Sequence, residues 1–243
     1  MRSNNLCRYT YALRQPARAN EIEIIKRNRS LAFLKTKQFD AALSDTGFPN
    51  FGPNPTEKAL FRAAEALYYL ERFSECSKVL ELLRTNFPHN KQALVVLDRA
   101  RSRSLEQNTG AYDFKQLQAE AKKLRPPHLD HATYIGPIEI KHTESKGRGL
   151  FVTKAVKAGE LLLCEKAFSH AYASEGDGSS KITLLLNLET NQGFMGAQAN
   201  LIKLIVQKLY RNPSVAPAFT TLYHGTYEGV STPAVDTEPI VDT

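Results

Sequence analysis

Small and apolar residues recur along the first half of the chain with a spacing of 34 positions. The aligned pairs are Ala32 with Ala66, Phe33 with Leu67, Phe39 with Phe73, and Ala42 with Cys76. Small residues that recur at one position let two helices approach closely, and aromatic residues one helical face away fill the space between successive units. The pattern therefore predicts helical hairpins that stack on one another and bury a continuous core.

The same pattern predicts where the helices lie. The expected segments are residues 28–37 and 39–46 for one hairpin, 57–70 and 73–86 for the next, and 91–107 for a helix that caps the stack. Residues 47–55, GFPNFGPNP, interrupt the repeat with an irregular loop. At the end of this loop, Asn54 is expected to cap the next helix, with Pro55 at its first position. Residues 6–15 are expected to be the remnant of an earlier hairpin.

The spacing and the pattern resemble the tetratricopeptide repeat (TPR), whose helical hairpins present a concave face to an extended peptide. The resemblance assigns residues 21–107 to TPR-like repeats with a capping helix, and residues 1–20 to a basic N-terminal segment left from a TPR helix. It also implies three peptide-binding residues, Asn28, Lys58 and Arg62. They match positions that clamp a terminal carboxylate in TPR domains that grip the acidic C-terminal tails of heat-shock chaperones.

The chemistry of this implied clamp is reasonable at two of the three positions. Lys58 and Arg62 lie at positions i and i+4 of one helix, where both side chains can donate hydrogen bonds to one carboxylate. The alternative is a pair of solvated basic residues on a helix surface.

A linker is expected at residues 108–133, with a short helix at residues 114–124. Pro126 and Pro127 end that helix and favour an extended connection. Beyond the linker, residues 133–143, 149–156 and 161–168 read as three strands. Residues 146–149 are therefore expected to form a loop between strands, and residues 157–160 a tight turn.

The glycines of this loop do not fit the familiar phosphate-binding motifs. A P-loop requires GxxxxGK[ST] and a dinucleotide-binding site requires GxGxxG, and each leads from a strand into a helix. Here Gly149 leads into the β-branched, strand-like segment FVTKAV. The sequence therefore excludes both kinds of phosphate site.

Residues 146–151, KGRGLF, and residues 157–162, KAGELL, resemble the opening of a SET domain, the fold of protein lysine methyltransferases. The chain as a whole resembles fungal TPR and SET domain-containing proteins, relatives of the SET and MYND group. This resemblance implies an α+β, mainly helical protein, in which TPR hairpins precede a small β-rich partial SET domain. That domain would occupy residues 134–243, with strands at 134–168 and a helical insertion and tail at 169–243.

The SET resemblance also implies a site for S-adenosyl-L-methionine. In that family the GxG loop packs against the methyl donor. Carried over by position, Lys146 and Arg148 would lie near the carboxylate of the donor, and Gly147 and Gly149 would let the backbone approach it. Considered without the resemblance, the same residues favour a tight β-turn with solvated cations.

The chain is expected to lack the catalytic half of such a domain. The family's catalytic half carries an Asn-His pair, a late tyrosine and often a cysteine cluster that binds zinc. The 243 residues contain no Asn-His dipeptide, and their three cysteines are widely spaced. No catalytic residue and no metal ligand are therefore assigned, and the chain is expected to be inactive alone. The alternative function is a non-catalytic TPR scaffold that binds peptides.

Net charge and composition indicate which classes of partner and which locations to expect. The chain carries 32 Lys and Arg against 25 Asp and Glu, a formal charge of +7 that favours acidic partners. The resemblance to TPR and SET proteins implies that the partner is a protein substrate or a peptide, whereas no specific contact with nucleic acid is indicated. The apolar runs are too short to span a membrane. The basic residues 1–20 could also mark a mitochondrial presequence, but Pro16 interrupts any amphipathic helix there. No sharp run of Lys and Arg singles out nuclear import, so the expected location is the nucleus or the cytoplasm.

Overall fold

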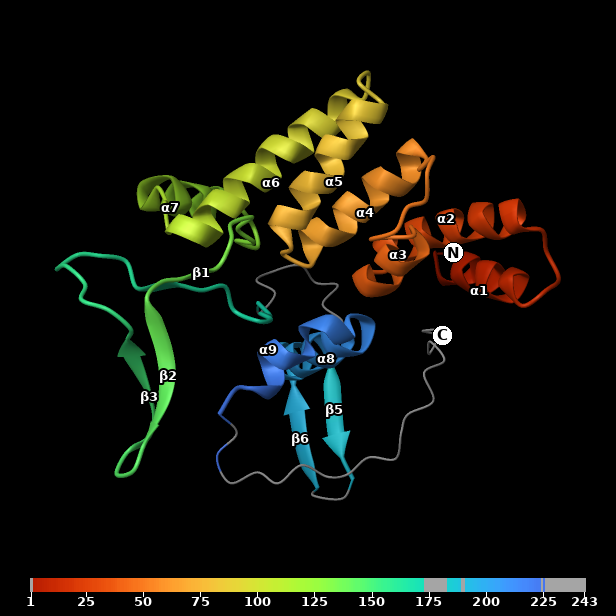
Figure 1. The fold of residues 1–243 in the computed structure, drawn as a ribbon. Coiled ribbons are helices and arrows are strands. Elements are labelled where there is room, and N and C mark those ends of the chain that lie inside the picture. The colour runs from red at the N-terminus through yellow and green to blue at the C-terminus, as the bar shows by residue number, and fades with distance from the viewer. Residues whose placement is uncertain (1, 173–182, 189–190, 224, 226–243) are drawn as a thin grey trace.

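The computed structural model describes residues 2–172, 183–188, 191–223 and 225. A stack of helices forms the upper part of the molecule in Figure 1, and two β-hairpins extend from its lower side. One hairpin follows the stack in the chain, and the other lies under a helix that docks beneath the stack. The mainly helical α+β class expected from the sequence is confirmed.

Six helices build the stack and a seventh follows it. They are α1 (Arg2–Leu13), α2 (Ala19–Lys35), α3 (Phe39–Asp45), α4 (Glu57–Tyr69), α5 (Phe73–Asn86), α6 (Lys91–Thr109) and α7 (Phe114–Lys123). Helices α3 to α7 begin and end within two residues of the segments predicted from the 34-residue pattern and the linker composition. The repeat pattern and the linker composition therefore located α3 to α7. The helix predicted at residues 28–37 is α2, which begins nine residues earlier, at Ala19.

The 34-residue repeat is also present in the backbone. Lys37 and Glu71, which are 34 positions apart, both adopt positive φ, at 60° and 59°. The next residue donates across the turn in each unit, from Gln38 N to the Phe33 oxygen and from Arg72 N to the Leu67 oxygen, both at 2.9 Å. Two helical hairpins therefore turn with the same geometry.

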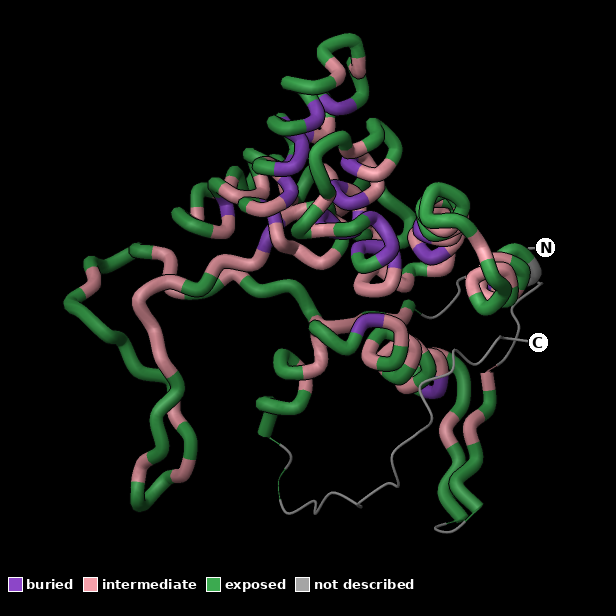
Figure 2. Tube along the Cα trace, turned by 45° about the vertical axis from the view of Figure 1, so that its right-hand side comes forward, coloured by how far each residue is buried: buried purple, intermediate pink, exposed green. Residues whose placement is uncertain are grey.

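The core of the protein lies inside this stack, as the purple segments of Figure 2 show. Its fully buried side chains come mostly from α4, α5 and α6, and the largest are Leu60, Leu67, Leu80, Leu83, Leu97 and Cys76. Burial raises the pKa of the Cys76 thiol to about 12, and its sulfur contacts the Ala64 carbonyl oxygen at 3.2 Å. Cys76 therefore packs as a small apolar residue between helices.

Two details at the start of helices differ from the predictions. Thr56, and not Asn54, caps α4, and its hydroxyl accepts from Ala59 N at 3.3 Å. Asn54 and Pro55 therefore belong to the loop that precedes the cap. Helix α2 begins at Ala19, so the boundary predicted at residue 20 falls inside its first turn.

The basic N-terminal segment is part of the stack. Helix α1 packs against α2 and buries Leu6, and the Arg29 guanidinium of α2 donates to the Thr10 hydroxyl at 3.4 Å. The same guanidinium forms a bidentate pair with Asp45 of α3, at 2.6 and 2.7 Å. Arg29 therefore ties α1, α2 and α3 together.

A buried carboxylate fixes the linker after α7 to the stack. Glu106 of α6, 7% exposed, accepts from Arg103 at 2.7 Å, His131 Nδ1 at 2.8 Å and Ala132 N at 2.9 Å. Nearby, the Tyr68 hydroxyl donates to Asp130 at 2.8 Å. The chain therefore leaves the stack in a direction set by hydrogen bonds rather than by a free linker.

Four short strands follow. β1 (Tyr134–Ile135) pairs with β4 (Leu163–Cys164), and β2 (Ile138–Thr143) pairs with β3 (Gly147–Val152), both antiparallel. The strand predicted for residues 133–143 is divided, because Pro137 supplies no N–H for pairing. The strand predicted for residues 161–168 is wrong except at Leu163–Cys164, since only these two residues have a partner strand.

The next segment contains a hairpin that the sequence analysis missed. β5 (Leu184–Asn187) pairs with β6 (Gln192–Met195), and α8 (Gly196–Arg211), the 3₁₀ turn η1 (Pro213–Val215) and α9 (Ala216–Thr220) follow. The prediction of a purely helical insertion is therefore wrong over β5 and β6. Helix α8 lies within the segment predicted to be helical. The tail after residue 225 lies outside the described residues.

Asn212 joins the end of α8 to the stack. Its Oδ1 accepts from Phe39 N at 2.6 Å and from Asp40 N at 3.4 Å, and its Nδ2 donates to the Lys37 oxygen at 3.0 Å. The N-cap residue of α3, Gln38, makes no capping bond with its own side chain. A residue 173 positions away therefore supplies the cap of α3.

An Asn212→Ala variant is expected to lose about 1–2 kcal/mol of unfolding free energy, because two backbone N–H groups lose their acceptor. Amide hydrogen exchange at Phe39 and Asp40 is expected to accelerate. Asn108→Ala, which changes an exposed asparagine of α6, serves as the control. Equal exchange at α3 in both variants would show that Asn212 does not cap it.

Candidate functional site

The GxG segment lies in the β2–β3 hairpin, and the structure corrects its conformation. Residues 146–149 were expected to form a loop, but the turn is residues 144–146 and Gly147 already pairs with Thr143. Gly147 adopts a φ of +71°. A three-residue hairpin turn followed by a left-handed residue is a standard hairpin connection, and glycine adopts that conformation without strain. The position of Gly147 is therefore explained by the turn.

Gly149 has a different structural reason. A Cβ atom at this position would lie 2.9 Å from the Phe151 ring, which stands on the same face of β3. Nothing lies within 4 Å of the corresponding position at Gly147. Gly149 therefore makes room for the Phe151 ring, whereas the backbone at Gly147 is open to a ligand from outside.

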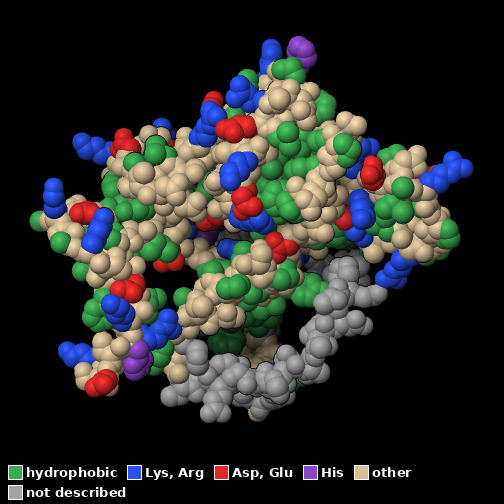
Figure 3. Space-filling view, viewed as in Figure 1, with side chains coloured by type: hydrophobic (Ala, Val, Ile, Leu, Met, Phe, Trp, Pro, Cys, Tyr) green, Lys and Arg blue, Asp and Glu red, His purple; other side chains and the backbone are tan. Residues whose placement is uncertain are grey.

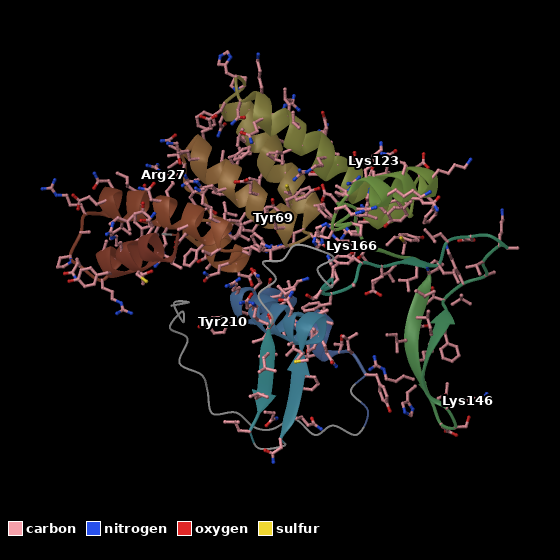
Figure 4. All side chains as sticks on the ribbon, turned by 180° about the vertical axis from the view of Figure 1, so that it is seen from behind. Arg27, Tyr69, Lys123, Lys146, Lys166 and Tyr210 are labelled. Carbon is pink, nitrogen blue, oxygen red and sulfur yellow. The ribbon has the colours of Figure 1, made fainter. Side chains whose placement is uncertain are left out.

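The two predicted cations lie beside these glycines. Lys146 lies at the tip of the hairpin, away from the helical stack, as Figure 4 shows. The Arg148 guanidinium donates through Nη1 to the Thr221 oxygen at 3.0 Å, which links the hairpin to the segment after α9. Both side chains are exposed. The four predicted donor-binding residues are consecutive in the chain, and the two cations among them lie on an open surface.

This set of residues fits one part of S-adenosyl-L-methionine. Two cationic side chains and an open backbone at Gly147 suit the carboxylate end of the donor. The fit therefore concerns the carboxylate end of the donor.

A second candidate site is a depression of about 350 Å³ on the helical stack. Its lining residues are Leu31 of α2; Glu57, Lys58, Phe61, Arg62 and Glu65 of α4; and Asn90 and Gln92 at the start of α6. Leu31 and Phe61 are apolar, and the other six side chains are polar or charged. The first helices of successive hairpins therefore share one surface, as stacked hairpins do.

Two of the three predicted peptide-binding residues meet in this depression. Lys58 and Arg62 line it together, whereas Asn28 is exposed on α2 and is not among the lining residues. Arg62 donates to the main-chain oxygen of Arg27, which Figure 4 labels beside α4. Burial, followed by the charge of Arg27, lowers the pKa of Arg62.

Glu65 is a residue of this depression that the sequence analysis missed. It lies one turn beyond Phe61 on α4, and its carboxylate forms no hydrogen bond or ion pair with the part of the chain that the structure describes. Burial raises the pKa of Glu65, although Arg62 and Arg99 act in the opposite direction. The spacing of residues 57, 61 and 65 on one helix face was the signal that could have identified it.

The raised pKa of Glu65 predicts a pH-dependent stability. The folded state holds the proton more tightly than the unfolded state, so this contribution is present at low pH and is lost as pH rises through the folded pKa. The unfolding free energy of the wild type minus that of Glu65→Gln is therefore expected to be more positive at about pH 4 than at about pH 7. Urea unfolding at both pH values measures it, and Glu81→Gln is the exposed control. A difference that grows with pH would contradict the assignment.

The other depression, of about 440 Å³, lies between α3, the 47–55 loop and α5. Arg72 and Glu75 line it and form a bidentate pair with each other at 2.7 Å. The Arg72 guanidinium also lies 5.4 Å from the centre of the Phe48 ring. Arg72 and Glu75 are therefore committed to each other and to the loop. Asp40, the third charged residue of the lining, accepts from Ser214 N at 2.8 Å and from the Ser214 hydroxyl at 2.7 Å.

Some kinds of site are not found in the described residues. They contain no group of three or more His, Cys, Asp or Glu side chains arranged to hold a metal ion. His128 contacts His170, and no third ligand of that kind joins them. Within the same part of the chain, no helix combines the length and apolar character needed to cross a membrane. On the face shown in Figure 3, basic and acidic side chains are interspersed.

Comparison with known proteins gives one informative match. The chain is similar to a curated protein from Gibberella zeae named Methyltransferase. The two are 38% identical over 234 residues, which cover 96% of this chain and 32% of the relative. The chain thus spans about a third of the length of that relative. No family model matches the chain, and no solved structure matches it.

The extent of this match bears on both candidate sites. A match over 96% of the chain is long enough to include the helical stack and the β2–β3 hairpin. The depression and the GxG segment therefore belong to one region that the two proteins share.

Proposed function

We propose that this chain is the donor-binding and substrate-binding part of a SET-type protein lysine methyltransferase. The observation that carries the proposal is the similarity to the protein named Methyltransferase over 96% of the chain. The SET-like order of KGRGLF and KAGELL, placed in and after the β2–β3 hairpin, supports the type. The helical hairpins support the TPR part of the assignment, and a nuclear or cytoplasmic location remains part of the proposal.

In this function, the β2–β3 hairpin contacts the carboxylate end of S-adenosyl-L-methionine. The donor supplies an electrophilic methyl group when it is bound. Lys146 and Arg148 neutralise its carboxylate, and the open side of Gly147 lets the main chain approach. The hydrogen bond from Arg148 to Thr221 uses one N–H group of the guanidinium, so its remaining donors are available.

Calorimetric titration with S-adenosyl-L-methionine tests this function. The wild-type chain is expected to bind the donor saturably, and the Lys146→Ala, Arg148→Ala double variant to bind at least about tenfold more weakly, because two charge-assisted contacts are lost. Lys154→Ala, a change at an exposed lysine just after β3, is expected to bind as the wild type does. Equal affinity in all three chains would contradict a role for the GxG segment.

A second candidate function is peptide binding by the helical stack. The shared depression between α2, α4 and α6 supports it, because Lys58 and Arg62 line the same surface at positions i and i+4. A peptide carboxylate, such as those in the acidic C-terminal tails of heat-shock chaperones, fits these two cations. In a methyltransferase, the same surface would hold a protein substrate or partner.

A further inference from the structure

Glu65 changes the charge pattern of the depression. Lys58 and Arg62 make one end of it basic, and Glu57 at its rim accepts from Asn90 Nδ2 at 2.8 Å. The carboxylate of Glu65 has no such hydrogen-bonding partner among the described residues, although the charges of Arg62 and Arg99 favour its ionised form. A half-buried carboxylate without a donor is stabilised by any ligand that brings one.

The spacing along α4 sets the distance between the two charged ends. Lys58 and Glu65 are seven residues apart, which corresponds to about 10 Å along a helix axis. Side chains of an extended peptide alternate between two faces, so two that enter one groove are an even number of residues apart. A separation of four residues covers about 13 Å, which flexible charged side chains can adjust to this distance. Phe61 lies between the two ends on the same helix, with Leu31 of α2 as the other apolar lining residue.

We propose that Glu65 binds a lysine or arginine side chain of an extended peptide whose side-chain carboxylate, four residues away on the same face, lies at Lys58 and Arg62. The apolar stem of the basic side chain packs on Phe61 and Leu31, and its charged head reaches Glu65. This proposal rests on the peptide-binding function of the depression. It makes the partner a peptide of mixed charge, whereas the implied chaperone-tail clamp requires only an acidic one.

Fluorescence polarisation with four labelled peptides tests the proposal. The peptides are otherwise neutral and amidated, and carry a lysine and a glutamate four residues apart, the lysine alone, the glutamate alone, or neither. The wild-type chain is expected to bind the doubly charged peptide about fivefold more tightly than either singly charged one. In Glu65→Gln, the lysine of the peptide is expected to give no gain in affinity. In Lys58→Ala, the glutamate of the peptide is expected to give no gain in affinity.

Two controls separate recognition from folding. Glu81→Gln changes an exposed carboxylate of α5 outside the depression and is expected to leave all four affinities unchanged. Glu65→Gln removes a half-buried charge, so it is expected to remain as stable as the wild type at about pH 7. Its thermal unfolding checks that lost binding does not reflect lost structure.

The outcomes distinguish the subsite from the function on which it rests. If Glu65→Gln keeps the preference for the lysine-bearing peptide, the Glu65 subsite is wrong, but peptide binding by the depression is not contradicted. If the wild type binds the glutamate-bearing peptide and an added lysine does not raise its affinity, the Glu65 subsite is also wrong. If no peptide binds, both the peptide-binding function and the Glu65 subsite are wrong.

Discussion

A Leu67→Ala variant is expected to lose about 2–5 kcal/mol of unfolding free energy, because it leaves a cavity in the centre of the stack. Leu67 of α4 is 0% exposed and belongs to the main buried cluster. Its main-chain oxygen also accepts the hydrogen bond that closes the α4–α5 turn. Urea unfolding measures the loss as a lower transition midpoint with an unchanged slope.

The matched control for this prediction is Leu94→Ala on α6. The Leu94 side chain is 42% exposed, so its removal is expected to change the unfolding free energy by no more than about 0.5 kcal/mol. Equal losses at both positions would mean that α4 does not pack as the structure shows.

A Glu106→Ala variant is expected to lose about 3–5 kcal/mol, because it leaves three donors without their acceptor in a buried position. The side chains of Glu106 and Arg103 are 9% and 13% exposed. Their pairing therefore occurs with little screening by solvent. Urea unfolding measures the loss, and hydrogen exchange at Ala132 N is expected to accelerate as the linker detaches from α6.

An exposed ion pair provides the comparison for Glu106. Glu81 contacts Arg101 at 2.9 Å, with both side chains more than half exposed, so Glu81→Ala is expected to cost at most about 1 kcal/mol. Glu106→Gln keeps one acceptor for Ala132 N, so its loss of unfolding free energy is expected to lie between those of Glu106→Ala and Glu81→Ala. A loss in Glu106→Ala no larger than that in Glu81→Ala would rule out its role as the anchor of the linker.

The helices were predictable because their cores repeat. Small and aromatic residues at a fixed spacing mark the buried face of each hairpin, so Phe33 and Leu67 could be paired from their positions in the repeat alone. The positive φ at Lys37 and Glu71 was not predictable, because neither residue is glycine and the turn is imposed by the packing of the two helices.

The β-rich half was less predictable because its strands are short and pair locally. Pairing restricts the third predicted strand to Leu163–Cys164 and divides the first at Pro137. The Leu-rich run of β5 carries no alternation of polar residues, so its pairing with β6 gave no clear period-two signal. The GxG motif indicated where the hairpin lies. It did not indicate that the turn ends before Gly147, because that depends on the positive φ of Gly147.

The residues that sequence reasoning missed act over long separations. Asn212 caps a helix 173 positions away, and Glu106 binds a linker 25 or more positions away. Such contacts leave no local pattern, because each partner satisfies a backbone or charged group that belongs to another element. Glu65 was within reach, since its place on the face of α4 follows from helical spacing alone.

The most direct test of the proposed methyltransferase function is a map of amide chemical shifts during titration with S-adenosyl-L-methionine. We expect saturable shifts at residues 146–149 and at the neighbouring strand β2, with the Lys146→Ala, Arg148→Ala chain showing none at the same concentrations. Shifts confined to the helical stack, or none at any concentration up to the solubility of the donor, would contradict donor binding by the GxG hairpin.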